Sequence, residues 1–293
     1  MNKSNKGAVV ITGTSTGLGR ATALLLDKQG YRVFAGVRTE KDAESLRQAA
    51  SGNLTPIIMD ITKTEQIKSA LDFVSLAVGE TGLFALINNA VVAANGAIEC
   101  TTIDDIKLNF EVNIIGQIVI IQAFLPLLRK ARGRIINISG GCGRAPIPYF
   151  GILSATKAAL ESITDCLRME LRSSGIEVLS ILPMDALLTP EQADKQEINC
   201  KKLLANISPE HQALYGKNHK IHMEDVIKSN RETGAPLEIV TEVILEALEA
   251  KKPKRQYFPT RSPWDSRLFG LCKRLLPHQY FYDNVFFKSF GYD

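Results

Sequence analysis

A glycine-rich turn at residues 12–19 is the first feature of the chain that could support chemistry. It reads TGTSTGLG and joins an apolar run (AVVIT, residues 8–12) to a segment with helical spacing of Ala and Leu. Glycines let the backbone approach a pyrophosphate at the positive end of a helix. Such turns also bind mononucleotides or only tighten a strand–helix corner, but this context favours a dinucleotide. The expected contacts are Gly13, Ser15, Thr16, Gly17, Leu18 and Gly19.

The spacing TGxxxGxG of this turn, rather than GxGxxG, resembles that of short-chain dehydrogenases/reductases. The similarity covers about residues 7–260 and continues through Asp60, Asn88-Asn89-Ala90, Asn113, Lys157 and Thr189. It is close to the retinol- and hydroxysteroid-dehydrogenase-like branch in VFAGVR (33–38), QAFLPLLRKARGRIINIS (122–139) and the basic, aromatic C-terminal extension. The resemblance implies a Rossmann-type fold, a nicotinamide dinucleotide and self-association.

The resemblance also implies cofactor contacts outside the turn. Asp60 and Ile61 should border the adenine, and Asn89 and Ala90 the adenosine ribose. Val91 stands where the family usually has glycine, so a larger side chain should enter a tight backbone position. The further expected cofactor contacts are Thr39, Lys157 and Thr189.

The end of the second strand indicates which dinucleotide is bound. An NAD-binding member usually carries an acid there to hold the ribose hydroxyls, whereas this chain has Val37 followed by Arg38. An arginine can pair with a 2′-phosphate; the alternative is a solvated side chain with no ligand contact. NADP(H) is therefore favoured over NAD(H).

The two residues that normally perform this family's acid chemistry are replaced. In the family a Tyr lies four residues before the active-site Lys, one helical turn away, so that the ammonium depresses the pKa of the phenol. Counting back from Lys157 gives Leu153, and the family's usual thirteen further residues give Gly140. Neither side chain can donate a proton.

A register slip would restore the pair by using Ser139 and Tyr149. The segment GCGRAPIPYFG (141–151) matches the branch without a gap, which argues against the slip. On a strand, Ser139 should also point away from the face of Gly140 and have a structural role. A positioned acid contributes about 10²–10⁴-fold, so ordinary alcohol–ketone chemistry is not expected.

Three residues are candidate replacements for the missing acid. Tyr149 could bring its phenol into the pocket or only form a wall for the substrate. Cys142 could act as a thiol acid or nucleophile, or be buried as a small apolar residue. Asp185 could be an acid or base near the nicotinamide, or a helix cap. The expected substrate pocket comprises Gly140, Cys142, Tyr149, Leu153 and Met184, the last replacing the usual glycine after Pro183.

Lys157 and Asn113 are the retained residues of the expected catalytic machinery. Lys157 can bind the nicotinamide ribose hydroxyls without a Tyr partner; a helix-surface salt bridge is the alternative. The family uses the residue at Asn113 to kink a long helix and hold a water in a proton relay. Without the Tyr, that relay has lost its usual endpoint.

Alternating strand and helix patterns must position these residues. Apolar runs lie near residues 8–12, 32–37, 55–59, 84–88, 134–139 and 177–182. Helical patterns lie near 18–29, 41–50, 64–79, 103–130 and 151–174. Repeated strand–helix units predict a doubly wound α/β fold with a parallel sheet. Residues 190–230 resemble a helical lid, followed by an amphipathic helix and a short last strand.

Length and composition favour one domain over residues 1–260, followed by an extension at 261–293. The 293 residues are 45% hydrophobic, and we count no apolar run of the roughly 18 residues that span a bilayer. The start lacks a signal-peptide pattern, so a cytoplasmic protein is expected. The five scattered cysteines suggest reduced thiols, with neither disulfides nor a metal site.

The C-terminal segment differs in composition from the rest. Residues 251–293 carry nine Lys/Arg against three Asp/Glu, and eleven of the twenty aromatic residues. The extension could touch a membrane surface or, as we favour, pack over the substrate mouth or a partner subunit. No motif suggests nucleic acid binding.

Three functions fit these observations. The first is an NADP(H)-dependent reductase of a small apolar substrate, such as a conjugated alkene or imine, whose proton can come from solvent or the substrate. The second is a non-redox isomerase or cyclase in a biosynthetic pathway that keeps the nucleotide as a scaffold. The third is a catalytically silent nucleotide-binding protein.

Overall fold

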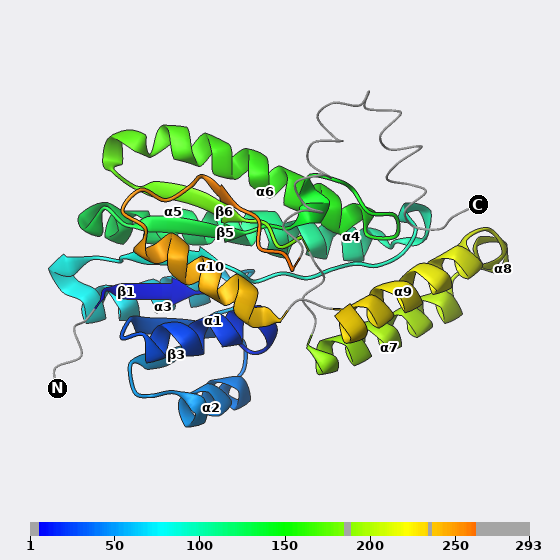
Figure 1. Ribbon diagram of the computed structural model, residues 1–293, viewed down its shortest axis with the longest axis horizontal. Helices are drawn as coiled ribbons and strands as arrows, with labels where there is room; N and C mark the ends of the chain where they lie inside the picture. Colours follow the sequence, from blue (N-terminus) through cyan, green and yellow to red (C-terminus); the bar gives the residue numbers. More distant parts are fainter. Residues whose placement is uncertain (1–5, 185–188, 234–235, 262–293) are drawn as a thin grey trace.

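A parallel seven-stranded sheet forms the centre of the protein (Figure 1). The computed structural model describes residues 6–184, 189–233 and 236–261. The strand order is β3-β2-β1-β4-β5-β6-β7, which confirms the doubly wound α/β expectation. The strands are β1 (Ala8–Ile11), β2 (Arg32–Val37), β3 (Leu54–Ile58), β4 (Ala85–Asn88), β5 (Arg134–Ile138), β6 (Glu177–Ile181) and β7 (Gln256–Tyr257).

Helices cover both faces of the sheet, which is why its strands are continuous apolar runs rather than alternating ones. On one face, α1 (Gly17–Lys28), α2 (Glu40–Ala49) and α10 (Leu237–Glu249) pack against side chains such as Val9 and Ile87. On the other, α3 (Thr64–Val78) and α5 (Gly116–Ala131) pack against Val10 and Leu86. The helix α6 (Gly151–Glu170) contacts β6 on this second face.

The expected helix at 103–130 is interrupted in the middle. Two α-helical segments, α4 (Ile103–Phe110) and α5, are joined by a π-helical turn, η3 (Glu111–Ile115), that contains Asn113. A π-turn inserts one residue into the helical ladder and is often found at functional sites. The helix is therefore interrupted at Asn113, where the resemblance implies a kink.

The same helix corrects the expectation about membrane-spanning length. Residues Ile103–Ala131 are long and apolar enough to cross a bilayer by length and composition, and half of the most apolar stretch is buried. Ile120, Ile121 and Phe124 belong to the core beneath the sheet. The expectation that no segment is long and apolar enough to span a bilayer was therefore wrong. A buried core helix meets the same criteria of length and composition, and the packing of this helix in the core explains why it is apolar.

A helical hairpin follows β6 and forms the lid, within the expected residues. It consists of α7 (Pro190–Asn206), α8 (Pro209–His211), a π-turn η6 (Gln212–Gly216) and α9 (Lys217–Thr233). α7 and α9 lie side by side beyond the ends of the strands (Figure 1). A small apolar cluster built on Phe150, Cys200 and Met223 joins this lid to the body. Asp185 and residues 262–293 lie outside the described residues.

Candidate active site

One cavity of about 560 Å³ lies where the strands end. Because the strands are parallel, the segments that follow β3, β2, β1, β4, β5 and β6 all meet at one edge of the sheet. Its lining includes most of the expected contacts: Gly13, Ser15, Thr16, Leu18, Gly19, Arg38, Asp60, Ile61, Asn89, Ala90, Gly140, Cys142, Leu153, Lys157 and Met184. The fold thus brings most of the expected cofactor and substrate residues into one continuous space.

The glycine-rich turn is tightly packed and ends in a helix with unused donors. A side chain at Gly13, whose φ is +69°, would place its Cβ 2.7 Å from Ala90 Cα. α1 starts at Gly17; Thr16 makes no side-chain capping bond, and the first turn holds no acid. The first amides of α1 are therefore available to bind an anion. Gly17 is covered by the lid, because a Cβ there would lie 2.7 Å from Gln192 Nε2.

Asn89 and Ala90 hold the turn to the end of β4. Their backbone amides both donate 2.9 Å hydrogen bonds to Thr12 Oγ1, and Asn89 Nδ2 donates to the Thr12 and Gly13 carbonyls. Val91 differs from expectation: its side chain is 49% exposed, and its backbone does not enter the left-handed region. The crowding predicted for Val91 is therefore absent, because its side chain borders the open cavity.

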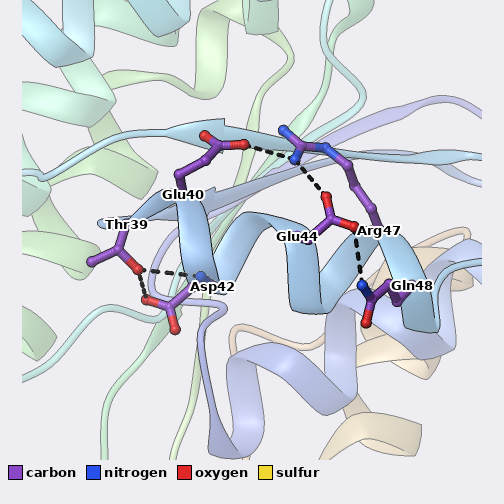
Figure 2. A network of polar contacts seen from close by, with 6 residues as sticks. All are labelled: Thr39, Glu40, Asp42, Glu44, Arg47 and Gln48. Atoms are coloured by element: carbon purple, nitrogen blue, oxygen red, sulfur yellow. Dashed lines mark hydrogen bonds and ion pairs between the residues drawn. The ribbon is translucent and has the colours of Figure 1, made fainter.

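The end of β2 presents Arg38 to the cavity and turns Thr39 away from it. Arg38 is exposed and lines the cavity. Thr39 instead caps α2: its hydroxyl accepts from Asp42 N and donates to Asp42 Oδ2 at 2.7 Å (Figure 2). Glu40 is paired with Arg47 at 2.7 Å (Figure 2). The acids nearest Arg38 in sequence are thus engaged with other groups.

Lys157 lies beneath the reacting end of the cavity. Its Nζ donates a 2.7 Å hydrogen bond to the carbonyl of Ile138, the last residue of β5. Burial lowers the pKa of its ammonium to about 8, although the nearby Cys142 and Glu161 act in the opposite direction. Leu153 precedes it by one turn of α6, and both line the cavity with Gly140. The positions of the missing acid pair therefore converge beside the retained lysine.

Three neighbours complete this end of the cavity. Ser139 Oγ donates to the carbonyl of Lys157 at 3.4 Å, the kind of structural bond expected for it, although Ser139 also borders the cavity. The Met184 side chain lies over Gly141, where a Cβ would meet its Sδ at 3.1 Å. Burial raises the pKa of the Cys142 thiol, while Lys157 lowers it. Cys142 is thus a protonated group that touches the cavity.

Asn113 lies beside the cavity but is not one of the described residues that line it. Its amide nitrogen donates to Val92 O at 2.8 Å and to Thr156 Oγ1 at 3.2 Å, and its Oδ1 accepts from Val92 N. These bonds fasten the segment after β4 to the π-turn and to α6. The side chain positions the cavity wall at Val92.

Tyr149 corrects the expected substrate pocket. Its backbone is left-handed, with φ +61°, and its ring stacks on His219 of the lid at 5.0 Å between centroids. It is not among the described residues that line the cavity, so the cavity gives no support to its phenol as the replacement acid. Burial raises the pKa of that phenol. The ring lies in the contact between lid and body.

The lid contributes cavity residues that no motif predicted. Gln192 and Gln196 from α7, and His222 and Val226 from α9, line the space opposite the strand ends. Thr189 does not line it; its hydroxyl caps α7 in a reciprocal pair with Gln192. In the sequence, the only sign of these lid residues is that each pair is four residues apart, so that its members share one face of a helix. This spacing does not reveal which face of the helix turns towards the cavity.

A model of the short chain dehydrogenase family matches residues 7–198. The chain belongs to the short-chain dehydrogenase family. This family comprises oxidoreductases that bind nicotinamide cofactors.

Curated relatives of this short-chain dehydrogenase lie in the retinol and hydroxysteroid branch. It is 35% identical over 270 residues to mouse (Mus musculus) retinol dehydrogenase 7, covering 92% of this chain and 84% of that protein. It is 35% identical over 274 residues to bovine (Bos taurus) 17-beta-hydroxysteroid dehydrogenase type 6, with the same coverage. The branch assignment made from sequence is confirmed.

Solved structures agree on the fold. A short-chain dehydrogenase from Streptomyces avermitilis superposes with a TM-score of 0.74 at 24% identity, covering 98% of both chains. One from Burkholderia cenocepacia, solved in complex with NADP, gives 0.70 at 22% identity, covering 97% of this chain and 99% of that chain. At this level of identity the likeness supports the Rossmann-type architecture.

Proposed function

We propose that the protein is an NADP(H)-dependent reductase of a small apolar substrate that works without the family's Ser–Tyr acid pair. One observation carries the proposal. A single cavity joins the glycine-rich turn and Arg38 to an apolar end where Lys157 lies beside Gly140 and Leu153.

The residues at the phosphate end suit NADP(H). The free amides at the start of α1 would hold the pyrophosphate, Arg38 the 2′-phosphate, and Lys157 the ribose next to the nicotinamide. Arg38 is already exposed to the cavity, and the carboxylate of Glu40 is paired with Arg47. When bound, the reduced cofactor supplies a hydride.

The other end suits an apolar ligand. Val92, Val112, Ile147, Phe150, Leu153 and Val226 contribute apolar side chains to its lining. The relatives are named for retinol and hydroxysteroids, which are apolar molecules. Because neither Gly140 nor Leu153 can protonate an alkoxide, a conjugated alkene or an imine suits the site better than a ketone. Their reduction can take its proton from water or from the substrate.

Loss of NADPH absorbance at 340 nm in the presence of an imine, or of a conjugated ketosteroid whose product is reduced at the carbon–carbon double bond, tests this reading. Turnover that depends on the substrate and on NADPH supports it. Product formed with no change in the cofactor's redox state would instead indicate the non-redox isomerase or cyclase. Nucleotide binding without turnover over a broad panel would indicate a silent binding protein.

The expected homo-oligomer, and membrane contact as the alternative role of residues 261–293, need separate tests. Sedimentation of the purified full chain, alone and with anionic vesicles, measures both. Proteins carrying Cys142→Ala test the thiol as a replacement acid by the same NADPH assay.

A further inference from the structure

The lid lies against the turn that would hold the pyrophosphate of a cofactor. A Cβ at Gly17 would lie 2.7 Å from Nε2 of Gln192 on α7, and Gln192 and Gln196 line the cavity together with Ser15 and Thr16. A dinucleotide with its pyrophosphate on this turn would therefore have α7 against it. Its departure depends on how easily the lid moves away.

The far end of the lid hairpin is joined to the body by one carboxylate. α8 and η6 form the turn at this end (Figure 1). From this turn, Tyr215 Oη donates a 2.6 Å hydrogen bond to Glu99 Oε2. His211 Nε2 lies 3.7 Å from the other oxygen, Glu99 Oε1, and adds a charge when it is protonated. We call this contact of Glu99 with Tyr215 and His211 the latch.

Glu99 belongs to a segment that is fixed to the body. It lies in the short helix η2 (Ile98–Cys100), between β4 and α4. Just before η2, Gly96 N donates a 2.7 Å hydrogen bond to the carbonyl of Tyr149. A Cβ at Gly96 would lie 2.9 Å from Leu203 Cδ1, so α7 packs directly on this segment. The latch therefore joins the lid to a part of the body that is held at both ends.

The strength of the latch suits a contact that breaks and forms again. A hydrogen bond from a hydroxyl to a carboxylate is stronger than one between neutral groups, and this bond raises the pKa of the Tyr215 phenol, so the hydroxyl remains the donor. The Glu99 side chain is 55% exposed, and exposed pairs contribute little to global stability. Removing the latch should free the end of the lid and leave the apolar cluster beneath it intact.

We propose that Glu99 keeps the lid closed over the bound nucleotide, and that its contacts with Tyr215 and His211 break when the nucleotide leaves. Glu99 is a positioning residue, because it acts through the lid and is not one of the described residues that line the cavity. The assignment rests on the proposed function only for a dinucleotide as the occupant of the cavity. It requires no hydride transfer and no particular substrate.

Stopped-flow release of NADPH tests the latch. Excess NADP⁺ displaces NADPH from the full chain, and the change in NADPH fluorescence gives the dissociation rate constant. Glu99→Ala and Tyr215→Phe should each release NADPH about 3- to 10-fold faster, the range expected for the loss of one hydrogen bond. Glu99→Gln, whose amide oxygen can accept the same bond, should restore most of the slow release.

Two further variants separate the latch from a general loss of structure. Glu99→Ala/Tyr215→Phe should release NADPH no faster than Glu99→Ala, because the two residues share one bond. Glu80→Ala is the matched control: it removes another exposed glutamate, paired with Lys130 on the body, and should release NADPH as the wild type does. The midpoint of thermal unfolding should be nearly the same in all these variants.

Three results would each overturn the latch. They are unchanged release by Glu99→Ala and Tyr215→Phe, equal acceleration by Glu80→Ala, and no NADPH binding by the wild type. Faster release from the two latch variants of a protein that never oxidises NADPH would support the latch and refute the reductase alone.

Discussion

Lys157 Nζ donates a 2.7 Å hydrogen bond to the carbonyl of Ile138, which ties α6 to the last residue of β5. The bond holds the ammonium at the junction between the phosphate end of the cavity and its apolar end. It leaves two of the three N–H donors for a ligand. Lys157 is thus placed to bind the cofactor even though Leu153 has replaced its phenolic neighbour.

Replacing Lys157 by Met should weaken NADPH binding by about 10- to 100-fold, since a hydrogen bond from a charged donor contributes about 1.5–3 kcal/mol. Calorimetric titration with NADPH measures the change. Lys130→Met, which removes an exposed lysine paired with Glu80, is the control and should bind as the wild type does. If Lys157→Met bound NADPH as tightly as Lys130→Met does, Lys157 would not be part of the cofactor site.

Restoring the acid pair should restore ordinary ketone reduction. Gly140 has extended backbone (φ 176°, ψ 159°), and a Cβ there would meet Cys142 Sγ at an ordinary 3.5 Å, so serine fits without strain. In Gly140→Ser/Leu153→Tyr the new phenol would lie one turn from Lys157. We expect ketone reduction, followed at 340 nm, to rise by about 10²-fold or more over the wild type.

The single variants Gly140→Ser and Leu153→Tyr control that experiment. Each should gain much less than the double variant, because the two groups act on the same oxygen and their effects are not additive. A double variant that binds NADPH normally and stays inactive towards ketones would show that the reacting end has been assigned to the wrong part of the cavity.

Arg38→Asp should reverse the preference between the two dinucleotides. The substitution removes the proposed partner of the 2′-phosphate and adds a repelling charge, so NADPH affinity should fall by about 10- to 100-fold while NADH affinity holds or improves. Thermal shift with each nucleotide reports the difference. As a control, Arg129→Asp, in the last turn of α5, should change neither the NADPH affinity nor the NADH affinity. Equal stabilisation of the wild type by NADPH and NADH would already refute the role of Arg38.

Acid should destabilise the lid through His222. Its pKa is about 4 in the fold against the ordinary 6.5 of a histidine, so the unfolded chain binds more protons between these values. The free energy of unfolding should therefore fall as the pH drops from about 6.5 to 4, by at most about 3 kcal/mol. Urea titrations across this window should show a shallower pH dependence for His222→Phe. Parallel pH curves for the two proteins would contradict the burial of the imidazole.

Much of the fold could be predicted because its signals are local. Most strands are short apolar runs of the length that a doubly covered sheet requires, and β1 to β6 begin and end within one residue of their predicted ranges. The glycine turn lies next to its own helix, and Leu153 and Lys157 are one turn apart on α6. These relationships need no knowledge of distant parts of the chain.

Tertiary packing alone decided the rest. The hydroxyls of Thr39 and Thr189 cap helices α2 and α7. Tyr149 stacks on His219, which lies seventy positions away along the sequence. His222 borders the cavity because of how the lid hairpin packs on Phe150. The sequence by itself determined the sheet, the phosphate turn and the loss of the acid pair. Which lid side chains face the substrate depended on contacts between distant segments, which leave no periodic trace in the chain.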